Sequence, residues 1–278
     1  MRFARLCFGL LLLTTAASFR AQTMDRLSGV SLRLTVLHDN VPLANATGAV
    51  VQKGSRYYVI TNRHVVLQCI QSQDPNNVGA WLCANKVEIL HNKLNLPGEW
   101  LPVTEDLFDA HNNKRWLEHP PLGTTEHPIP GSSVDLVALP LAQTAGIAFM
   151  PLNLQLRNTD MTLFPGDPVS IVGFPNGLAQ SGGLAIWKSG TIASDLEVSI
   201  DGQQEFLVDT TSRPGMSGSP VYARRSGTFQ GSGGMNQYPS TPGTVTKFLG
   251  IYSAQNQNNE IGFIWKAEAV QRLYDSLP

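Results

Sequence analysis

Short apolar runs separated by turn-forming residues recur along most of this chain. Residues 30–36 alternate apolar and polar side chains, as a strand buried on one face does. Residues 47–51 and 57–61 form two more such runs, and the connection between them contains Gly54 and Ser55, which favours a hairpin. Other runs lie at residues 87–90, 134–139, 169–172, 206–208, 221–222 and 248–252. Many short strands with frequent turns predict an all-β sandwich or barrel rather than βαβ units.

The length of 278 residues fits one large β domain or two small barrels that share a cleft. Apolar residues make up 42% of the chain and charged residues 15%, which is enough apolar surface for a substantial core. Residues 97–133 and 225–244 are rich in turn-forming residues, so we expect an irregular connection and a mobile surface loop there. The chain ends on a helical pattern, with apolar residues at Val270, Leu273, Tyr274 and Leu277.

The first 21 residues have the order of a secretory signal peptide. Arg2 and Arg5 precede an apolar run of about a dozen residues, and small residues follow at 16–18. The run is short for a bilayer span, which needs about 20 residues. We therefore expect residues 1–21 to be removed and the protein to be exported to the periplasm or secreted, without stable membrane association. A retained N-terminal anchor is the alternative.

Cysteine usage agrees with export. Cys7 would leave with the signal peptide, so that Cys69 and Cys83 remain. A disulfide between them would close a loop of about 15 residues and stabilise the fold by roughly 3 kcal/mol. The alternative is a pair of free thiols. Neither cysteine has a zinc-site spacing, so we expect no metal there.

The formal net charge of −1 gives no electrostatic reason to expect a nucleic-acid or anionic-membrane partner. The sequence carries no indication of the oligomeric state.

The sharpest chemical signal is the segment at residues 213–221, RPGMSGSPV. A serine hydroxyl becomes a nucleophile when a base takes its proton, and the oxyanion it creates needs hydrogen-bond donors. Gly215 lets the backbone turn so that the N–H groups of Gly215 and Ser217 can point at one spot. These two groups are the predicted oxyanion hole. The alternative is an ordinary glycine- and serine-rich turn between strands.

A base is then required, and His64 is the best of six histidines because it ends a clear strand, YVITNRHVV. The other histidines lie in polar or proline-rich surroundings. Three of them, His111, His119 and His127, have no spacing that fits a helical or finger-type metal site, so we expect no metal.

The third group should be a carboxylate that orients the imidazole. Asp135 stands inside the apolar run SVDLVALPL, where an acid is costly unless it has a partner. Asp106 and Asp109 are alternatives in a more charged segment. A strand-opening acid bonded to backbone groups alone is the other interpretation of Asp135.

These three segments, TNRHVV, DLVALPL and GMSGSPV, resemble the histidine, aspartate and serine segments of the trypsin-like serine peptidase family. The match is closer to bacterial members, the glutamyl endopeptidases and periplasmic heat-shock proteases, than to digestive trypsins. The order His, Asp, Ser also differs from that of an α/β-hydrolase, in which the serine comes first. The resemblance covers roughly residues 28–275.

The resemblance implies two antiparallel six-stranded β-barrels with the active-site cleft between them, followed by the short C-terminal helix. The barrels would comprise residues 28–150 and 151–278. His64 and Asp135 would come from the first barrel and Ser217 from the second, forming the catalytic triad.

The resemblance also implies residues of the substrate cleft. Ser253, Ala254 and Gln255 fall on the strand that pairs with the substrate backbone, and Thr211 falls at the floor of the primary specificity pocket. Met216 replaces the acid that animal trypsins pair with a new N-terminus, so activation by that ion pair is excluded. We expect no peptide-binding domain after the second barrel.

The sequence therefore predicts a serine endopeptidase that hydrolyses exported or extracellular proteins or peptides through an acyl-enzyme, without metal or organic cofactor. One alternative is a catalytically silent scaffold that binds proteins. Another is an esterase or acyl transferase that uses the same triad.

Overall fold

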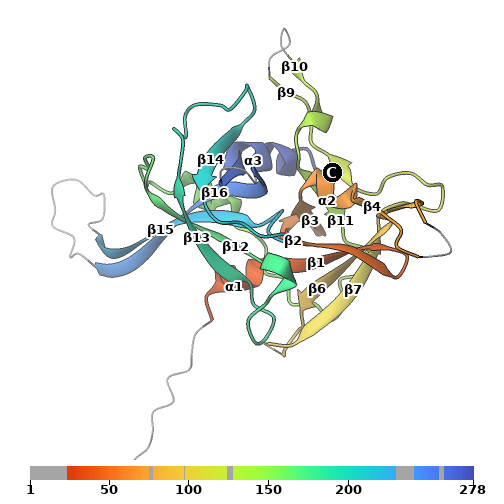
Figure 1. Ribbon diagram of the computed structural model, residues 1–278. Helices are drawn as coiled ribbons and strands as arrows, with labels where there is room; N and C mark the ends of the chain where they lie inside the picture. The colour runs from red at the N-terminus through yellow and green to blue at the C-terminus, as the bar shows by residue number, and fades with distance from the viewer. Residues whose placement is uncertain (1–23, 75–77, 97, 124–127, 230–240, 257–259) are drawn as a thin grey trace, which may run out of the picture.

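The computed structural model of the protein describes residues 24–74, 78–96, 98–123, 128–229, 241–256 and 260–278. The predicted signal peptide, residues 1–21, lies outside this part of the chain. Within it, antiparallel strands dominate and the helices are short (Figure 1).

Seven strands of the N-terminal half pair into one antiparallel sheet. Their spatial order is β7 (Trp100–Asp106), β6 (Lys86–Asn92), β1 (Ser31–His38), β2 (Val41–Lys53), β3 (Arg56–Thr61), β11 (Val137–Pro140) and β8 (Leu117–Glu118). In β1 the side chains of Leu32, Leu34 and Val36 are buried, while those between them are partly exposed. This alternation is the one expected from the sequence, and it directs one face of the sheet into a core of its own.

Six antiparallel strands of the C-terminal half close into a barrel. Their order around the barrel is β12 (Pro168–Gly173), β13 (Ile186–Ile192), β14 (Glu205–Asp209), β17 (Ile261–Lys266), β16 (Thr241–Asn256) and β15 (Pro220–Phe229). Phe206 and Val208 of β14 point into the barrel core, and Glu205 and Leu207 alternate with them on the outer face. Closure leaves the barrel without unpaired edges.

A third apolar cluster lies between the two halves and joins them. Tyr58 and Leu136 from the sheet side pack in it with Phe174 and Trp265 from the barrel. The two halves therefore share a continuous core, and the surface where they meet can hold side chains from both.

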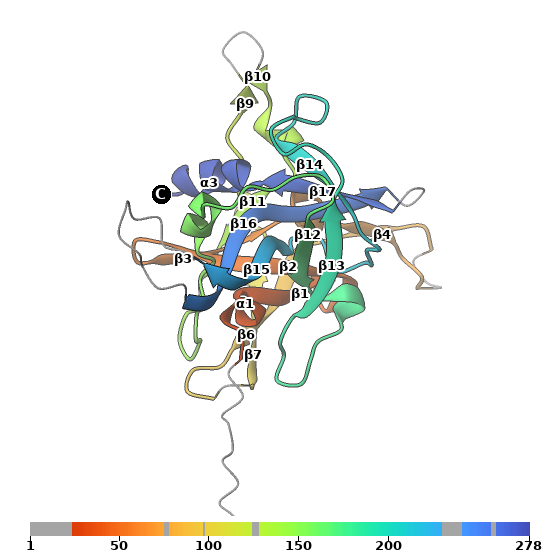
Figure 2. The same cartoon turned by 90° about the vertical axis from the view of Figure 1, so that its left-hand side faces the viewer.

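The remaining elements are short and connect or cover the two halves. They are α1 (Arg26–Val30), α2 (Arg63–Val66), β4 (Cys69–Gln71), β5 (Trp81–Cys83), β9 (Leu122–Gly123), β10 (Pro128–Ile129), α3 (Ala267–Asp275) and three 3-10 turns at Gly131–Ser133, Leu154–Asn158 and Pro175–Gly177. The strands β9 and β10 project from the body in both views (Figures 1 and 2).

The C-terminal helix forms where the periodicity predicted it. Val270 and Leu273 are fully buried, and Leu277, just beyond α3, is also buried. The helix packs against β16, β17 and β11 and thereby touches both halves (Figure 2).

The predicted all-β class with a closed six-stranded barrel and a short terminal helix is confirmed. The N-terminal half differs in strand count, because seven strands pair there, and their pairings within the described residues do not form a closed ring.

The segment 97–133 is more regular than its sequence indicated, because it contains the full-length strand β7. Val103 and Glu105 are buried and alternate with exposed neighbours, but Pro102 and the acidic residues obscure this pattern. Pro102 is tolerated because β7 is an edge strand and needs hydrogen bonds on one side alone. Likewise, β15 extends to Phe229 and β16 begins at Thr241, so much of the expected loop at 225–244 is strand, and residues 230–240 lie outside the described part.

Candidate active site

His64 lies on α2, the single helical turn that follows β3. Asn62 precedes this turn and donates from Nδ2 to the carbonyl oxygen of Asp135 at 2.8 Å. At the end of β3, the Thr61 hydroxyl donates to the Thr47 carbonyl oxygen at 2.8 Å. These contacts hold the start of α2 against its neighbours, while the His64 side chain remains 45% exposed.

Asp135 stands between two completely buried residues, Val134 and Leu136, just before β11. Its Oδ1 accepts the backbone N–H of His64 at 2.8 Å, and its Oδ2 lies 2.7 Å from Nδ1 of the same residue. Ser253 donates its hydroxyl to Oδ2 at 2.6 Å. Three hydrogen bonds to one carboxylate offset the cost of placing an acid in this apolar segment.

Ser217 completes the arrangement from the barrel side, because its Oγ lies 3.0 Å from Nε2 of His64. The imidazole is thus in contact with a carboxylate through one nitrogen and with a hydroxyl through the other. This geometry suits general-base activation of a serine, with the carboxylate fixing the imidazole tautomer.

The loop that carries Ser217 is fastened to both halves. Thr47 of β2 donates its N–H to the Ser217 carbonyl and its hydroxyl to the Gly215 carbonyl, each at 2.8 Å. On the barrel side, Gly218 donates to the Tyr252 carbonyl at 2.9 Å. Gly218 has φ +87°, and a Cβ there would lie 1.9 Å from the Thr47 oxygen, so the close approach requires glycine.

Gly215 gives this loop a second special conformation. Its φ is +94°, and a Cβ at this position would lie 2.3 Å from the Phe174 carbonyl oxygen. Across the described residues, neither the Gly215 nor the Ser217 N–H donates to another protein group. Both amide N–H groups are therefore unpaired within this part of the chain, as the donors of an oxyanion hole must be before a substrate binds.

A cavity of about 470 Å³ adjoins the serine. It is lined by Ser212, Arg213, Pro214, Ser217, Tyr252, Ala254 and Glu260. Of the three predicted cleft residues on β16, Ala254 lines this cavity and Ser253 is buried against Asp135. The side chain of Gln255 lies outside the described part of the chain.

Thr211 is exposed and is not among the residues that line this cavity, whereas the next residue, Ser212, lines it. The alternation of buried and exposed residues in β14 continues beyond its last residue, Asp209. Val208, Thr210 and Ser212 are buried, whereas Asp209 and Thr211 between them are exposed. The role of Thr211 at the floor of a specificity pocket stays a prediction.

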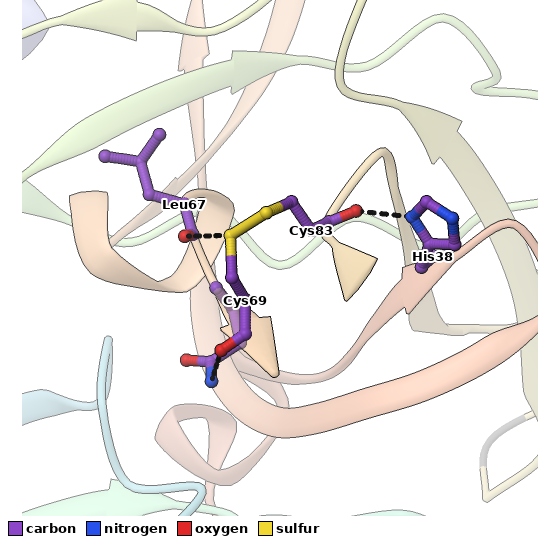
Figure 3. The surroundings of a disulfide bond; sticks show 5 residues. His38, Leu67, Cys69 and Cys83 are labelled. Carbon is purple, nitrogen blue, oxygen red and sulfur yellow. Dashed lines mark hydrogen bonds between the residues drawn. A yellow bond between two sulfur atoms is a disulfide. The ribbon is translucent and has the colours of Figure 1, made fainter. Parts of the chain in front are cut away.

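The disulfide expected from the sequence is present and joins Cys69 of β4 to Cys83 of β5 (Figure 3). The two cysteines are directly opposite each other in the strand register. The carbonyl of Cys83 also lies 2.7 Å from Nδ1 of His38. This cross-link closes the loop that follows α2, the element that carries His64.

The alternative acids lie away from this arrangement. Asp106 is on β7, where its side chain is 64% exposed, and Asp109 accepts the backbone N–H groups of His111 and Asn113 in a turn. The Asn113 side chain also donates from Nδ2 to Oδ2 of Asp109 at 3.0 Å. This bond first, and the backbone bonds after it, lower the pKa of Asp109. Neither acid contacts His64.

The other histidines have local roles. His119 is buried and its Nε2 lies 3.0 Å from the carbonyl of Ala269 in α3, and burial lowers its pKa. His91 is buried beside the Phe149 ring, and burial lowers its pKa to about 4. In the part of the chain that the structure describes, no three His, Cys, Asp or Glu side chains gather as metal ligands. His127 lies outside that part.

Glu205 was not expected from the sequence to belong to this region. It begins β14 on the outer face of the barrel, opposite Trp265 of β17. Burial, together with the negative charges of Asp135 and Asp201, raises the pKa of Glu205 to about 7. No local pattern marks this residue, because the charges that act on it belong to distant segments.

Two further findings concern the chain as a whole. A family model described as the trypsin-like peptidase domain matches residues 46–231, which include the three residues joined by these hydrogen bonds. Among the described helices, none has the length and apolar character needed to cross a membrane.

Among solved structures, the serine endoprotease from Yersinia pestis matches over 90% of this chain with 15% sequence identity and a TM-score of 0.47. The match covers 63% of that endoprotease, so this chain corresponds to less than two thirds of its length. No curated protein matches.

Proposed function

This chain belongs to the trypsin-like peptidase family, and on that premise we propose that it is a serine endopeptidase with Ser217 as nucleophile, His64 as base and Asp135 as orienting acid. The observation that carries the proposal is the continuous chain of hydrogen bonds. Asp135 Oδ2 lies 2.7 Å from His64 Nδ1, and His64 Nε2 lies 3.0 Å from Ser217 Oγ.

The proposed reaction begins when the Ser217 oxygen attacks the carbonyl carbon of the peptide bond. A C–O bond forms while His64 Nε2 takes the serine proton, and the resulting imidazolium is stabilised by Asp135. The negative charge on the former carbonyl oxygen is bound by the Gly215 and Ser217 N–H groups.

The intermediate collapses when the C–N bond breaks and Nε2 gives its proton to the leaving amine. Water then enters, loses a proton to Nε2 and attacks the acyl-serine ester. The acid product leaves and Ser217 regains its proton, so no metal, oxidant or organic cofactor is needed for the cycle.

Asp135 is prepared for this role by its other two hydrogen bonds. The His64 N–H and the Ser253 hydroxyl both donate to it, so its lone pairs are directed before the reaction starts. Fixed donors reduce the reorganisation required when the imidazole becomes charged. Ser253 acts here as a positioning residue.

We also propose that the substrates are proteins or peptides outside the cytoplasm. The charged, apolar and small-residue order of residues 1–21 supports export. The Cys69–Cys83 disulfide is consistent with an oxidising compartment.

The experiment that tests the activity is labelling of the purified protein with a fluorophosphonate, followed by peptide mapping. We expect a single labelled residue, Ser217, and loss of both labelling and peptide hydrolysis in Ser217→Ala. Equal labelling of the wild type and Ser217→Ala would refute the proposal.

Ser219→Ala is the matched control. Ser219 is two residues away and fully buried, and its hydroxyl makes no hydrogen bond to a described residue. This variant should therefore keep its labelling. A wild-type protein that takes the label but hydrolyses esters and no peptides would instead favour the esterase alternative.

A further inference from the structure

Thr47 of β2 is a completely buried threonine whose hydroxyl makes two hydrogen bonds to the other half of the protein. Its Oγ1 donates to the Gly215 carbonyl oxygen at 2.8 Å and accepts the Phe174 N–H at 3.1 Å. Gly215 lies in the loop that carries the proposed nucleophile, and Phe174 directly follows β12 of the barrel. One hydroxyl of the N-terminal half therefore joins two separate segments of the C-terminal half.

The turn that begins at Phe174 also binds the peptide on the other side of Gly215. The Asn176 N–H donates to the Pro214 carbonyl oxygen at 2.6 Å. The Pro214–Gly215 peptide bond is trans, so the Gly215 N–H points opposite to that carbonyl and away from the turn. A half-turn of this peptide plane would break the bond to Asn176 and would put a carbonyl oxygen where the N–H had been. The bond therefore opposes the rotation that would remove one donor from the proposed oxyanion hole.

The turn is short and lies directly against the loop that carries Ser217. Asn176 has φ +52° and ψ 27°, a left-handed conformation that asparagine adopts more readily than most residues. The Gly177 N–H donates back to the Phe174 carbonyl oxygen at 2.9 Å, and that same oxygen would lie 2.3 Å from a Cβ on Gly215. Because no space separates the two segments, a displacement of the turn would displace Gly215 as well.

The backbone of Thr47 has a separate role, which a change of its side chain would leave in place. The Thr47 N–H donates to the Ser217 carbonyl oxygen at 2.8 Å, and the Thr47 carbonyl accepts the Thr61 hydroxyl at 2.8 Å. Every residue type except proline offers these backbone groups. The hydroxyl of Thr47 can therefore be removed without removing the bond that holds Ser217 itself.

We propose that Thr47 is a positioning residue for the oxyanion hole. Its hydroxyl binds the Gly215 carbonyl and the turn at Phe174 together, so that both peptides flanking Gly215 are held and the Gly215 N–H stays directed at the developing oxyanion. This inference rests on the proposed peptidase function. The hydroxyl comes from the N-terminal half and the oxyanion hole from the barrel, so the docking of the two halves orders the oxyanion hole as well as the triad.

The test measures kcat and KM for one peptide substrate in three variants of this side chain. Thr47→Val keeps the branched shape without the hydroxyl, Thr47→Ala also removes the hydroxyl and serves where the valine variant does not fold, and Thr47→Ser keeps the hydroxyl. We expect kcat to fall about 10- to 100-fold in the valine and alanine variants, with KM within about threefold, because the oxyanion exists in the transition state and not in the bound substrate. Thr47→Ser should keep kcat within about threefold of wild type, because both hydrogen bonds remain possible.

A peptidyl trifluoromethyl ketone gives a readout that a loss of stability would not change. The Ser217 oxygen adds to its carbonyl carbon, the serine proton passes to His64, and the former carbonyl oxygen becomes a stable oxyanion. Across the variants, the inhibition constant of the ketone should rise in proportion to the fall in kcat/KM. The inhibition constant of the corresponding alcohol, which has no carbonyl to attack, should stay constant.

Ser31→Ala is the matched control. Ser31 of β1 is also buried, and its hydroxyl donates to the Val172 carbonyl oxygen of the barrel at 2.7 Å, so it joins the same two halves. Val172 lies within β12 and outside both the turn and the loop that carries Ser217. This variant should lose stability in urea unfolding, as Thr47→Val should, but keep its kcat and its affinity for the ketone.

Wild-type kcat in a folded Thr47→Val or Thr47→Ala variant would overturn the inference. A loss of kcat in Thr47→Ser as large as theirs, or a rise in KM at unchanged kcat, would also overturn it. Fluorophosphonate labelling separates the two proposals. A wild-type protein that neither takes the label at Ser217 nor cleaves any peptide contradicts the peptidase function itself, whereas an active wild type with unaffected Thr47 variants contradicts the positioning role alone.

Discussion

Replacing Glu205 with glutamine should stabilise the protein at alkaline pH. Glu205 is partly buried on the outer face of β14, near the negative charges of Asp135 and Asp201. Burial is the larger cause and the two aspartates the smaller, and together they raise the pKa of Glu205 from 4.5 to about 7. The ionised form of this glutamate is therefore less favourable in the folded protein than in the unfolded chain.

The sign of the effect follows from proton binding. Between about pH 4.5 and pH 7 the folded state holds the Glu205 proton more tightly than the unfolded state, so the free energy of unfolding falls as pH rises through this window. The full difference in pKa corresponds to about 3.4 kcal/mol. Glu205 is partly exposed and solvent screens its charge, so we expect a little less than half of that value, about 1.5 kcal/mol.

The assay is urea unfolding of wild type and Glu205→Gln at pH 5 and pH 8, with the disulfide intact. At pH 8 the variant should have a free energy of unfolding about 1.5 kcal/mol above that of the wild type, with an unchanged m-value. At pH 5 most of this difference should disappear. Glu88→Gln, on β6 in the N-terminal sheet, controls for the loss of one negative charge. A Glu205→Gln variant that shows the same stability difference at both pH values would refute the reasoning.

Two other predictions concern the serine loop and the cross-link. Gly215→Ala should lower kcat/KM at least about 100-fold, because the new Cβ would collide with the Phe174 oxygen and displace an oxyanion-hole N–H. Gly54→Ala is the control, because Gly54 also has a positive φ but has open space around it. This variant should lose about 1 kcal/mol of stability and keep its kcat/KM. Wild-type kinetics in Gly215→Ala would argue against the oxyanion hole. Reduction of the Cys69–Cys83 disulfide should lower the free energy of unfolding by up to about 3 kcal/mol, which a thermal melt would record as a lower Tm. An unchanged Tm would show that the disulfide does not stabilise the fold by restricting the unfolded chain.

Features encoded within a few neighbouring residues could be predicted from the sequence. The alternation at 30–36 predicts the half-buried strand β1, and the spacing of Val270 and Leu273 predicts the buried face of α3. The strand β7 was missed because Pro102 and its acidic neighbours obscure the alternation. Local patterns predict an element wherever its own side chains dictate which face is buried.

The sequence by itself determined the strand-rich class and the three segments that carry Ser217, His64 and Asp135. The tertiary structure alone decided what surrounds them. Ser253 donates to Asp135 across 118 positions of the chain, and Ser212 rather than Thr211 lines the cavity beside Ser217. The charges that act on Glu205 likewise come from other segments. Hydrogen bonds and electrostatic interactions depend on distances in space, and these are fixed by strand register and by the packing of the two halves rather than by any short stretch of sequence.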